Sequence, residues 1–159
     1  MSGSPHTVKK AIAHERLRAR SGTGTRDRDG NVLANGERMT RTEFEESVEQ
    51  VLADLPEAYA RRLDNVEVLI EDAPSAATLR EMGLDPRRDT LFGLYDGVPL
   101  GERSIEDTWL PDRITLFYKP LVRSFRSPRR IREEIRKTVL HEIAHFFGMD
   151  DEEIEDLGY

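Results

Sequence analysis

Residues 141–151, HEIAHFFGMDD, carry the strongest local pattern in this chain. The first five of them read H-E-x-x-H, and on an α-helix two residues four positions apart lie on the same face, one turn apart. The imidazoles of His141 and His145 can therefore reach one metal ion. Zinc accepts imidazole and carboxylate ligands, and a catalytic zinc keeps one position open. Glu142, beside the pair, can deprotonate a water molecule in that position.

The residues after this pair predict a third ligand. Gly148 follows His145 by three positions, where a helix that must turn sharply needs a residue with access to positive φ. Asp151 follows three positions later and can return a carboxylate to the metal. Asp150 would replace it if the turn differed by one residue, so we rank Asp151 first and Asp150 second.

The distribution of histidines supports a metal site. The chain has four, and His6 and His14 lie in a segment that we expect to be outside the folded domain. Every His of the expected domain is therefore in the motif. The alternative interpretation is a surface helix with two solvated His and an ordinary glycine cap.

The spacing H-E-x-x-H-x-x-G-x-x-D resembles the motif of the zincin metallopeptidases, and within them that of the small bacterial group called minimal zincins. The run from Val139 to Tyr159 carries the resemblance, and the order of elements from about Thr42 onward is also similar. The resemblance implies a zinc-dependent peptidase that acts on a peptide or protein substrate. It also implies one zinc ion per chain, with Glu142 as the general base and with three zinc ligands, His141, His145 and Asp151.

Composition limits the other possibilities. The chain has no Cys, which excludes disulfides and thiolate zinc sites, and it has no apolar run of membrane-spanning length or secretory h-region. We therefore expect a cytoplasmic protein without a membrane partner. Residues 1–41 carry nine Lys or Arg and four Asp or Glu, a net charge of +5, which leaves −12 for residues 42–159 of a chain with net charge −7. An acidic domain argues against nucleic acid as its partner.

The same patterns predict an α+β domain over residues 42–159. A basic, disordered tail is predicted over residues 1–41, with a short helix over residues 8–20 as the alternative for that part of the tail. Thr42 is predicted to cap a helix with an apolar stripe. Strands are predicted at 66–71, 91–95 and 112–119, a short helix at 75–82, and the long metal helix from Pro128. The expected fold is a small three-stranded sheet packed against the long metal-binding helix and the N-terminal helix.

Two questions about the substrate stay open at this point. Pro120 suits an edge strand, and the resemblance implies that residues 113–121 form the edge that receives the substrate as an added strand. Tyr118 and Tyr159 are candidates for a hydrogen bond to the oxyanion, against a purely structural role for both. An alternative to the peptidase also stays open for the whole chain: a non-catalytic, zinc-stabilised module that binds a protein partner.

Overall fold

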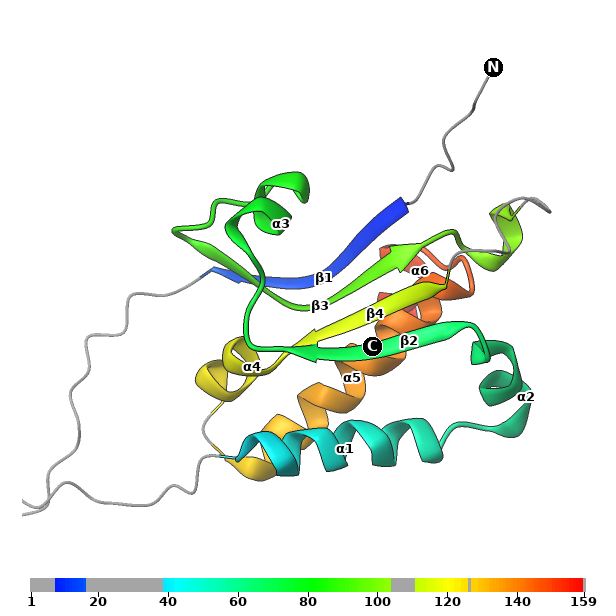
Figure 1. Ribbon diagram of the computed structural model, residues 1–159, viewed down its shortest axis with the longest axis horizontal. Helices are drawn as coiled ribbons and strands as arrows, with labels where there is room; N and C mark the ends of the chain where they lie inside the picture. Colours follow the sequence, from blue (N-terminus) through cyan, green and yellow to red (C-terminus); the bar gives the residue numbers. More distant parts are fainter. Residues whose placement is uncertain (1–7, 17–38, 104–110, 126, 159) are drawn as a thin grey trace, which may run out of the picture.

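The computed structural model describes residues 8–16, 39–103, 111–125 and 127–158, with the first of these segments described by its backbone. These residues form four strands, six α-helices and two 3₁₀ turns (Figure 1). In chain order the elements are β1 (Val8–Arg16), α1 (Arg41–Ala53), α2 (Glu57–Ala60), η1 (Arg61–Leu63), β2 (Val66–Glu71), α3 (Ala76–Glu81), β3 (Asp89–Gly97), η2 (Leu100–Glu102), β4 (Asp112–Phe117), α4 (Tyr118–Ser124), α5 (Pro128–Phe146) and α6 (Asp151–Asp156).

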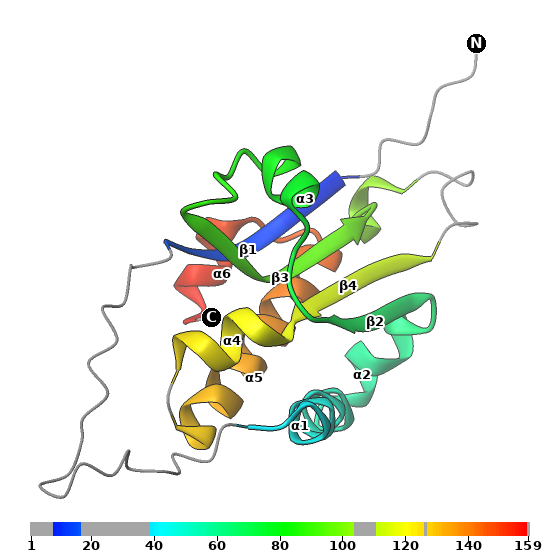
Figure 2. The same ribbon diagram turned by 60° about the vertical axis from the view of Figure 1, so that its left-hand side comes forward.

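The strands form one mixed sheet in the order β1-β3-β4-β2. β2 and β4 are parallel, with Val66 opposite Asp112, whereas β3 runs antiparallel to β4. β1 is antiparallel to β3 and lies at the edge of the sheet. Figure 2 shows β1 and β2 on opposite sides of the central pair. The predicted α+β class is confirmed, and β1 is an addition to the three predicted strands.

The main core lies between one face of the sheet and the helices α1 and α5. The apolar stripe predicted for α1 is buried at Phe44, Val48 and Val51. The stripe of α5 is buried along the whole helix, and both meet the sheet side chains of the same core cluster, Phe92, Tyr95, Ile114 and Leu116. Because both stripes follow the helical period, this layer could be predicted from the sequence.

The opposite face of the sheet is covered by the short helix α3. Leu79 of α3 packs with Leu91, Leu94 and Phe117 in a second, smaller cluster. Ser75 caps α3 by accepting from the amide of Thr78, as the sequence suggests. β4 is therefore buried on both faces. Separately, none of the helices that the structure describes is long and apolar enough to cross a membrane.

Residues 8–16 differ from the prediction. They pair with β3 from Val8 opposite Gly97 to Arg16 opposite Asp89, and they form no helix. The strand depends on backbone pairing with a segment far away in sequence, which a local pattern does not reveal. Most of the remaining predicted tail, residues 1–7 and 17–38, lies outside the described residues.

The prediction of an edge strand over residues 113–121 is wrong. β4 lies between β3 and β2, and it ends at Phe117. Tyr118 starts α4, so Pro120 lies in the first turn of a helix, where its missing amide hydrogen costs no hydrogen bond. Proline is compatible with both an edge strand and a helix start, and only the tertiary structure distinguishes them.

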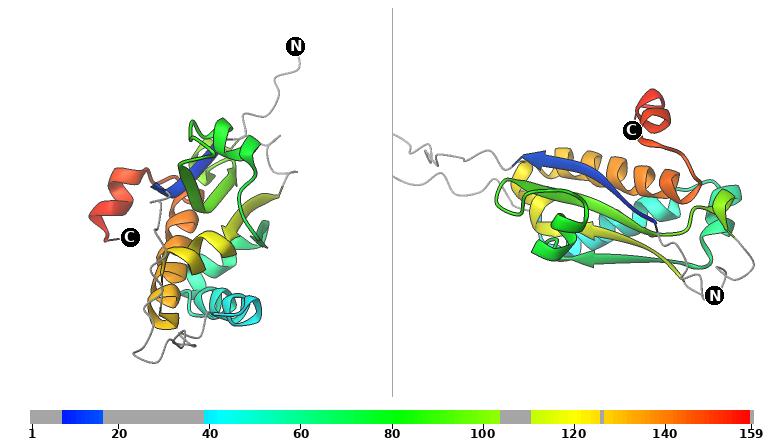
Figure 3. Two further views of the ribbon diagram at one scale, coloured as in Figure 1. Left: turned by 90° about the vertical axis from the view of Figure 1, so that its left-hand side faces the viewer. Right: turned by 90° about the horizontal axis from the view of Figure 1, so that it is seen from above.

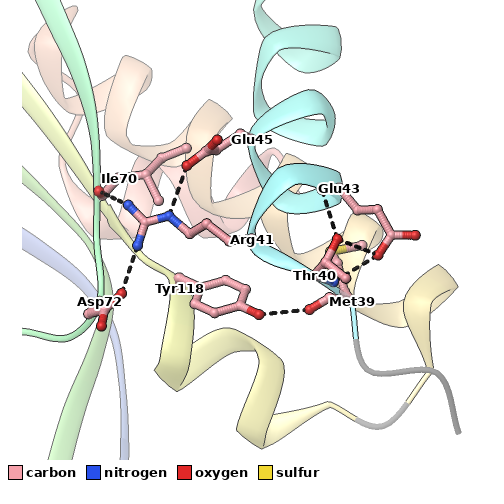
Figure 4. A network of polar contacts seen from close by, with 8 residues as sticks. All are labelled: Met39, Thr40, Arg41, Glu43, Glu45, Ile70, Asp72 and Tyr118. Carbon is pink, nitrogen blue, oxygen red and sulfur yellow. Dashed lines mark hydrogen bonds and ion pairs between the residues drawn. The ribbon is translucent and has the colours of Figure 1, made fainter. Parts of the chain in front are cut away.

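The start of α1 also differs by two residues from the prediction. Thr40, not Thr42, is the N-cap, and it forms a capping box with Glu43. Figure 4 shows how this end is attached to the sheet: Arg41 donates to the carbonyl oxygen of Ile70 in β2 and pairs with Asp72 and Glu45. The described part of the domain therefore includes the buried Met39, three residues before the predicted boundary.

Candidate metal centre

The metal helix begins and ends at residues that favour those positions. Ser127 is the N-cap of α5 and accepts a hydrogen bond from the amide of Arg130, and Pro128 follows as the first helical residue. At the other end Gly148 has φ of 93°. The predicted left-handed glycine is thus confirmed.

The turn after α5 is a Schellman motif. The amide of Gly148 donates to the carbonyl oxygen of His145 at 2.9 Å, and the amide of Met149 donates to that of Ala144 at 3.1 Å. These two bonds reverse the chain direction directly after the second histidine. As a result, the residues that follow return toward the metal face of α5.

The same turn fixes the tautomer of His145. Its Nδ1 lies 3.0 Å from the carbonyl oxygen of Met149. Because a carbonyl can only accept, Nδ1 must carry the proton, and the lone pair of the imidazole is then on Nε2. Metal-binding histidines are commonly oriented in this way by a carbonyl or carboxylate on the other nitrogen.

Three candidate ligands meet beside the turn. Oδ1 of Asp151 lies 3.3 Å from Nε2 of His141 and 3.2 Å from Nε2 of His145. All three ligand atoms lie within 4.8 Å of one another. Zinc bonds of 2.0–2.2 Å in tetrahedral geometry separate ligand atoms by roughly 3.3–3.6 Å. The donor set and the two distances from Asp151 therefore fit a zinc ion held by two imidazoles and one carboxylate.

The two neighbouring aspartates have different tasks. Asp150 is the N-cap of α6, where its carboxylate accepts from the amide of Glu153 at 2.9 Å. The side chain of Glu153 returns a bond to the amide of Asp150 and completes a capping box. This cap sets the direction of the first residue of α6, which is Asp151. Of the two aspartates, it is Asp151 whose carboxylate lies beside His141 and His145.

Glu142 is fully buried, and neither of its carboxylate oxygens has a hydrogen-bond partner among the described residues. Burial raises the pKa of Glu142 well above its usual value, and the charge of Asp151 adds to this shift. The backbone of Tyr95 approaches the carboxylate and opposes the shift, without the geometry of a full hydrogen bond. A buried acid without partners costs stability, and such groups are concentrated in active sites.

The family profile described as zincin-like metallopeptidase matches residues 63–159, which is more than half of the chain. The chain belongs to this family. A comparison with curated proteins found no match. The matched part includes all of the zincin-like site described above, from β2 to α6, and it excludes β1 and α1.

The zincin-like site is asymmetric in its exposure. His145 and Glu142 are buried on the inner side, whereas the side chain of Asp151 is 72% exposed. Figure 3 shows α6, which begins with Asp151, projecting to one side of α5 and away from the sheet. The metal site is thus open to solvent on the side of α6.

Burial also affects the first histidine. It lowers the pKa of His141, and the electrostatic interaction with His145 acts in the same direction, whereas the hydrogen bond that His141 donates to Asp151 opposes both. A lowered pKa keeps the imidazole neutral, which is the form that binds a metal. The burial of His141 therefore favours the neutral, metal-binding form of its side chain.

Sequence reasoning missed Gly93 of β3 as part of the site. A Cβ at this position would lie 2.5 Å from Oε1 of Glu142 and 2.7 Å from Cγ2 of Thr138. β3 can cross α5 at Glu142 only because residue 93 has no side chain. An isolated glycine inside a strand pattern marks such a close approach, so the signal was present in the run from Leu91 to Tyr95.

The two tyrosines proposed for the oxyanion have different outcomes. The hydroxyl of Tyr118 donates to the carbonyl oxygen of Met39 at 2.8 Å (Figure 4). The ring of Tyr118 packs edge-on against Phe44. These contacts attach α4 to α1, which is the structural alternative for this residue. Tyr159 lies outside the described residues.

Proposed function

We propose that this chain is a zinc-dependent peptidase that holds one zinc ion with His141, His145 and Asp151. The observation that carries the proposal is the close meeting of these three ligand atoms beside Glu142, a buried carboxylate without a hydrogen-bond partner in the part of the chain that the structure describes. A structural zinc site needs ligands only. A second, uncompensated carboxylate next to them is costly unless it takes part in a reaction.

The chemistry follows from the arrangement of these residues. A bound zinc would polarise the substrate carbonyl and lower the pKa of water from 15.7 to about 7. Glu142 takes a proton from the attacking water on its carboxylate and later passes it to the nitrogen of the leaving amine. The raised pKa of Glu142 makes its carboxylate a stronger base, which favours the first of these transfers. The peptide carbonyl carbon gains the hydroxyl, and the C–N bond breaks.

Metal content is the first test. Protein purified without an affinity tag or chelator should contain about one zinc per chain, and His145→Ala should lose it. Loss of a residue that only orients a zinc ligand lowers metal affinity by roughly 10–100-fold. Asp151→Ala removes a ligand itself, so its zinc affinity should fall by at least this much. Asp150→Ala is the matched control, because its carboxylate caps α6. If both aspartate variants retained zinc equally well, the ligand set would be wrong.

The second test separates the peptidase from the non-catalytic binding module. A mixed-sequence library of unstructured peptides, analysed by mass spectrometry, should be cleaved by the wild type. Glu142→Gln should retain zinc and lose this cleavage. A binding module would retain zinc and cleave nothing in either form, and unchanged cleavage by Glu142→Gln would contradict the assigned role of this residue.

A further inference from the structure

The two edges of the sheet are closed in different ways. At one edge, β2 has Arg41 bound to the carbonyl oxygen of Ile70, so a side chain takes one of its main-chain acceptors. At the other edge, the free side of β3 is covered by a whole strand, β1. The second edge is next to α5, which contacts both β3 and β1.

β1 follows β3 over the catalytic residue. Ile12 lies directly opposite Gly93, the residue of β3 that is in closest contact with Glu142. β1 also contacts α5 itself, in addition to its contacts with β3. Figure 3 shows β1 passing over the metal helix when the molecule is seen from above. An extended chain at this edge therefore lies beside the candidate site.

Three features favour β1 as an occupant of this edge. The family match begins at residue 63, so it includes β3 and α5 but neither β1 nor the core helix α1. The segment is one antiparallel strand that, among the described strands, pairs with β3 alone. Its sequence, VKKAIAHER, has three Lys or Arg and one Glu, whereas residues 42–159 have a net charge of −12.

From this arrangement, and on the basis of the proposed peptidase function, we propose that residues 8–16 occupy the edge of β3 at which an extended peptide substrate binds, and so inhibit the enzyme from within. A peptide that adds to a sheet edge takes its affinity from main-chain hydrogen bonds to the edge strand. The outward amides and carbonyls of β3 can serve only one chain at a time. Substrate binding then requires that β1 leaves the sheet.

The tether makes this competition effective. A segment in the same chain acts at an effective concentration on the order of 1 mM. If β1 binds the edge of β3 with a dissociation constant of about 0.1 mM, the edge is occupied roughly ten times as often as it is free, and release of β1 raises kcat/KM roughly tenfold. The opposite arrangement gives the opposite result. If β1 were the permanent edge strand and substrate bound to its outer side, removing its amides would lower activity.

The first experiment weakens β1 in the full-length chain. Neighbouring residues of a strand direct their amides to opposite sides, so Ala11→Pro with Ile12→Pro removes one donor to β3 and one on the outer side. We expect kcat/KM for the mixed peptide library to rise roughly tenfold. Ala11→Thr with Ile12→Val, which retains both amides, is the control and should match the wild type. An unchanged or lower kcat/KM in the proline variant with zinc retained would overturn the proposal.

The second experiment locks β1 in place. The chain has no Cys, so Lys9→Cys with Asp96→Cys introduces a single disulfide between directly opposed residues of β1 and β3. The oxidised form should lose cleavage of the library, and reduction of the same sample should restore it. Equal cleavage before and after reduction would show that β1 does not compete with substrate.

A binding measurement distinguishes failure of this proposal from failure of the proposed function. In a Glu142→Gln background, a fluorescent peptide VKKAIAHER should bind the proline variant and not the oxidised disulfide variant, and a scrambled peptide of the same composition should bind neither. If the peptide binds in this pattern but no variant that retains Glu142 cleaves the library, the competition at β3 is supported and the peptidase function is rejected. Absence of peptide binding to the proline variant would overturn the competition.

Discussion

Two glycines of β3, four residues apart, each lie against a buried carboxylate, and the two carboxylates are in opposite states. A Cβ on Gly93 would lie 2.5 Å from Oε1 of Glu142, and a Cβ on Gly97 would lie 1.9 Å from Oδ1 of Asp112. Both acids are almost completely excluded from solvent. Asp112 has a full set of donors, whereas Glu142 has none among the described residues.

The partners of Asp112 come from three directions. The hydroxyl of Tyr95 donates to Oδ1 at 2.8 Å, the amide of Val98 donates to the same oxygen at 3.0 Å, and the guanidinium of Arg103 pairs with Oδ2. Burial, with Asp112 adding to the effect, raises the pKa of Tyr95 and keeps its hydroxyl a donor. The guanidinium of Arg103 also lies 5.1 Å from the ring centre of Phe146 at the end of α5.

The comparison separates a structural acid from a reactive one. A buried charge with all its donors supports the fold, and loss of one partner is costly because the other stays buried. A buried acid without donors lowers stability and is available for chemistry. The same strand therefore covers a fully hydrogen-bonded acid at one glycine and, at the other, the acid to which we assign the role of general base.

The isosteric change from carboxylate to amide gives the largest expected difference between the two sites. Glu142→Gln should reduce peptidase turnover by about 10²–10⁴-fold, because a general base is lost. Its thermal stability should be equal to or above that of the wild type, because no charge is buried without donors. Turnover and melting temperature of Glu142→Gln and Asp112→Asn, measured side by side, test this. Asp112→Asn should show the reverse pattern, with lower stability and normal activity in the folded fraction.

Complete removal of the structural acid should be strongly destabilising. Asp112→Ala leaves Arg103 without its buried partner, and the free energy of unfolding should fall by about 3–5 kcal/mol. Urea unfolding followed by circular dichroism measures this. A loss below about 1 kcal/mol, which is typical of exposed ion pairs, would mean that the network contributes little to the fold.

The two glycines themselves can be compared by the same substitution. Gly93→Ala and Gly97→Ala each place a methyl group in a filled space, and overpacking of this kind costs about 1–3 kcal/mol. Only Gly93→Ala should also lower kcat in the folded fraction, because its methyl group displaces the carboxylate of Glu142. Equal kcat values for the two variants at a temperature where both are folded would show that the close approach of β3 does not position Glu142.

The smallest effect is expected from a single hydrogen bond. Tyr95→Phe removes one of three donors to Asp112, and the free energy of unfolding should fall by about 0.5–1.5 kcal/mol. Zinc content should be unchanged. A loss as large as that of Asp112→Ala would mean that Tyr95, and not Arg103, is the main partner of the acid.

Much of the metal centre could be predicted because it is local. His141, His145, Gly148 and Asp151 lie within eleven consecutive residues, and helical period, glycine conformation and turn length determine their relation. The α1 and α5 stripes were predicted for the same reason. The contacts of β3 with Glu142, and of Asp112 with Tyr95, join segments that are distant in sequence, and no local pattern encodes them.

The ambiguous residues show where local reasoning ends. Pro120 fits an edge strand and a first helical turn equally well, and the packing of β4 between two other strands selects the second. Asp96 and Gly97 resemble a turn, yet they end a strand whose glycine makes room for a carboxylate. In each case the local preference is weak, and the tertiary contact decides.

The sequence by itself determined the candidate ligand set, its order along the chain and the α+β class, because each depends on the periodicity or on the conformation of single residues. The tertiary structure alone decided which strand covers Glu142, which acid is satisfied, and which segment closes the edge beside the metal helix. All three features depend on pairing between strands that are distant in sequence. The backbone hydrogen bonds of such a pair are the same for any sequence, so the burial of the side chains decides which strands pair.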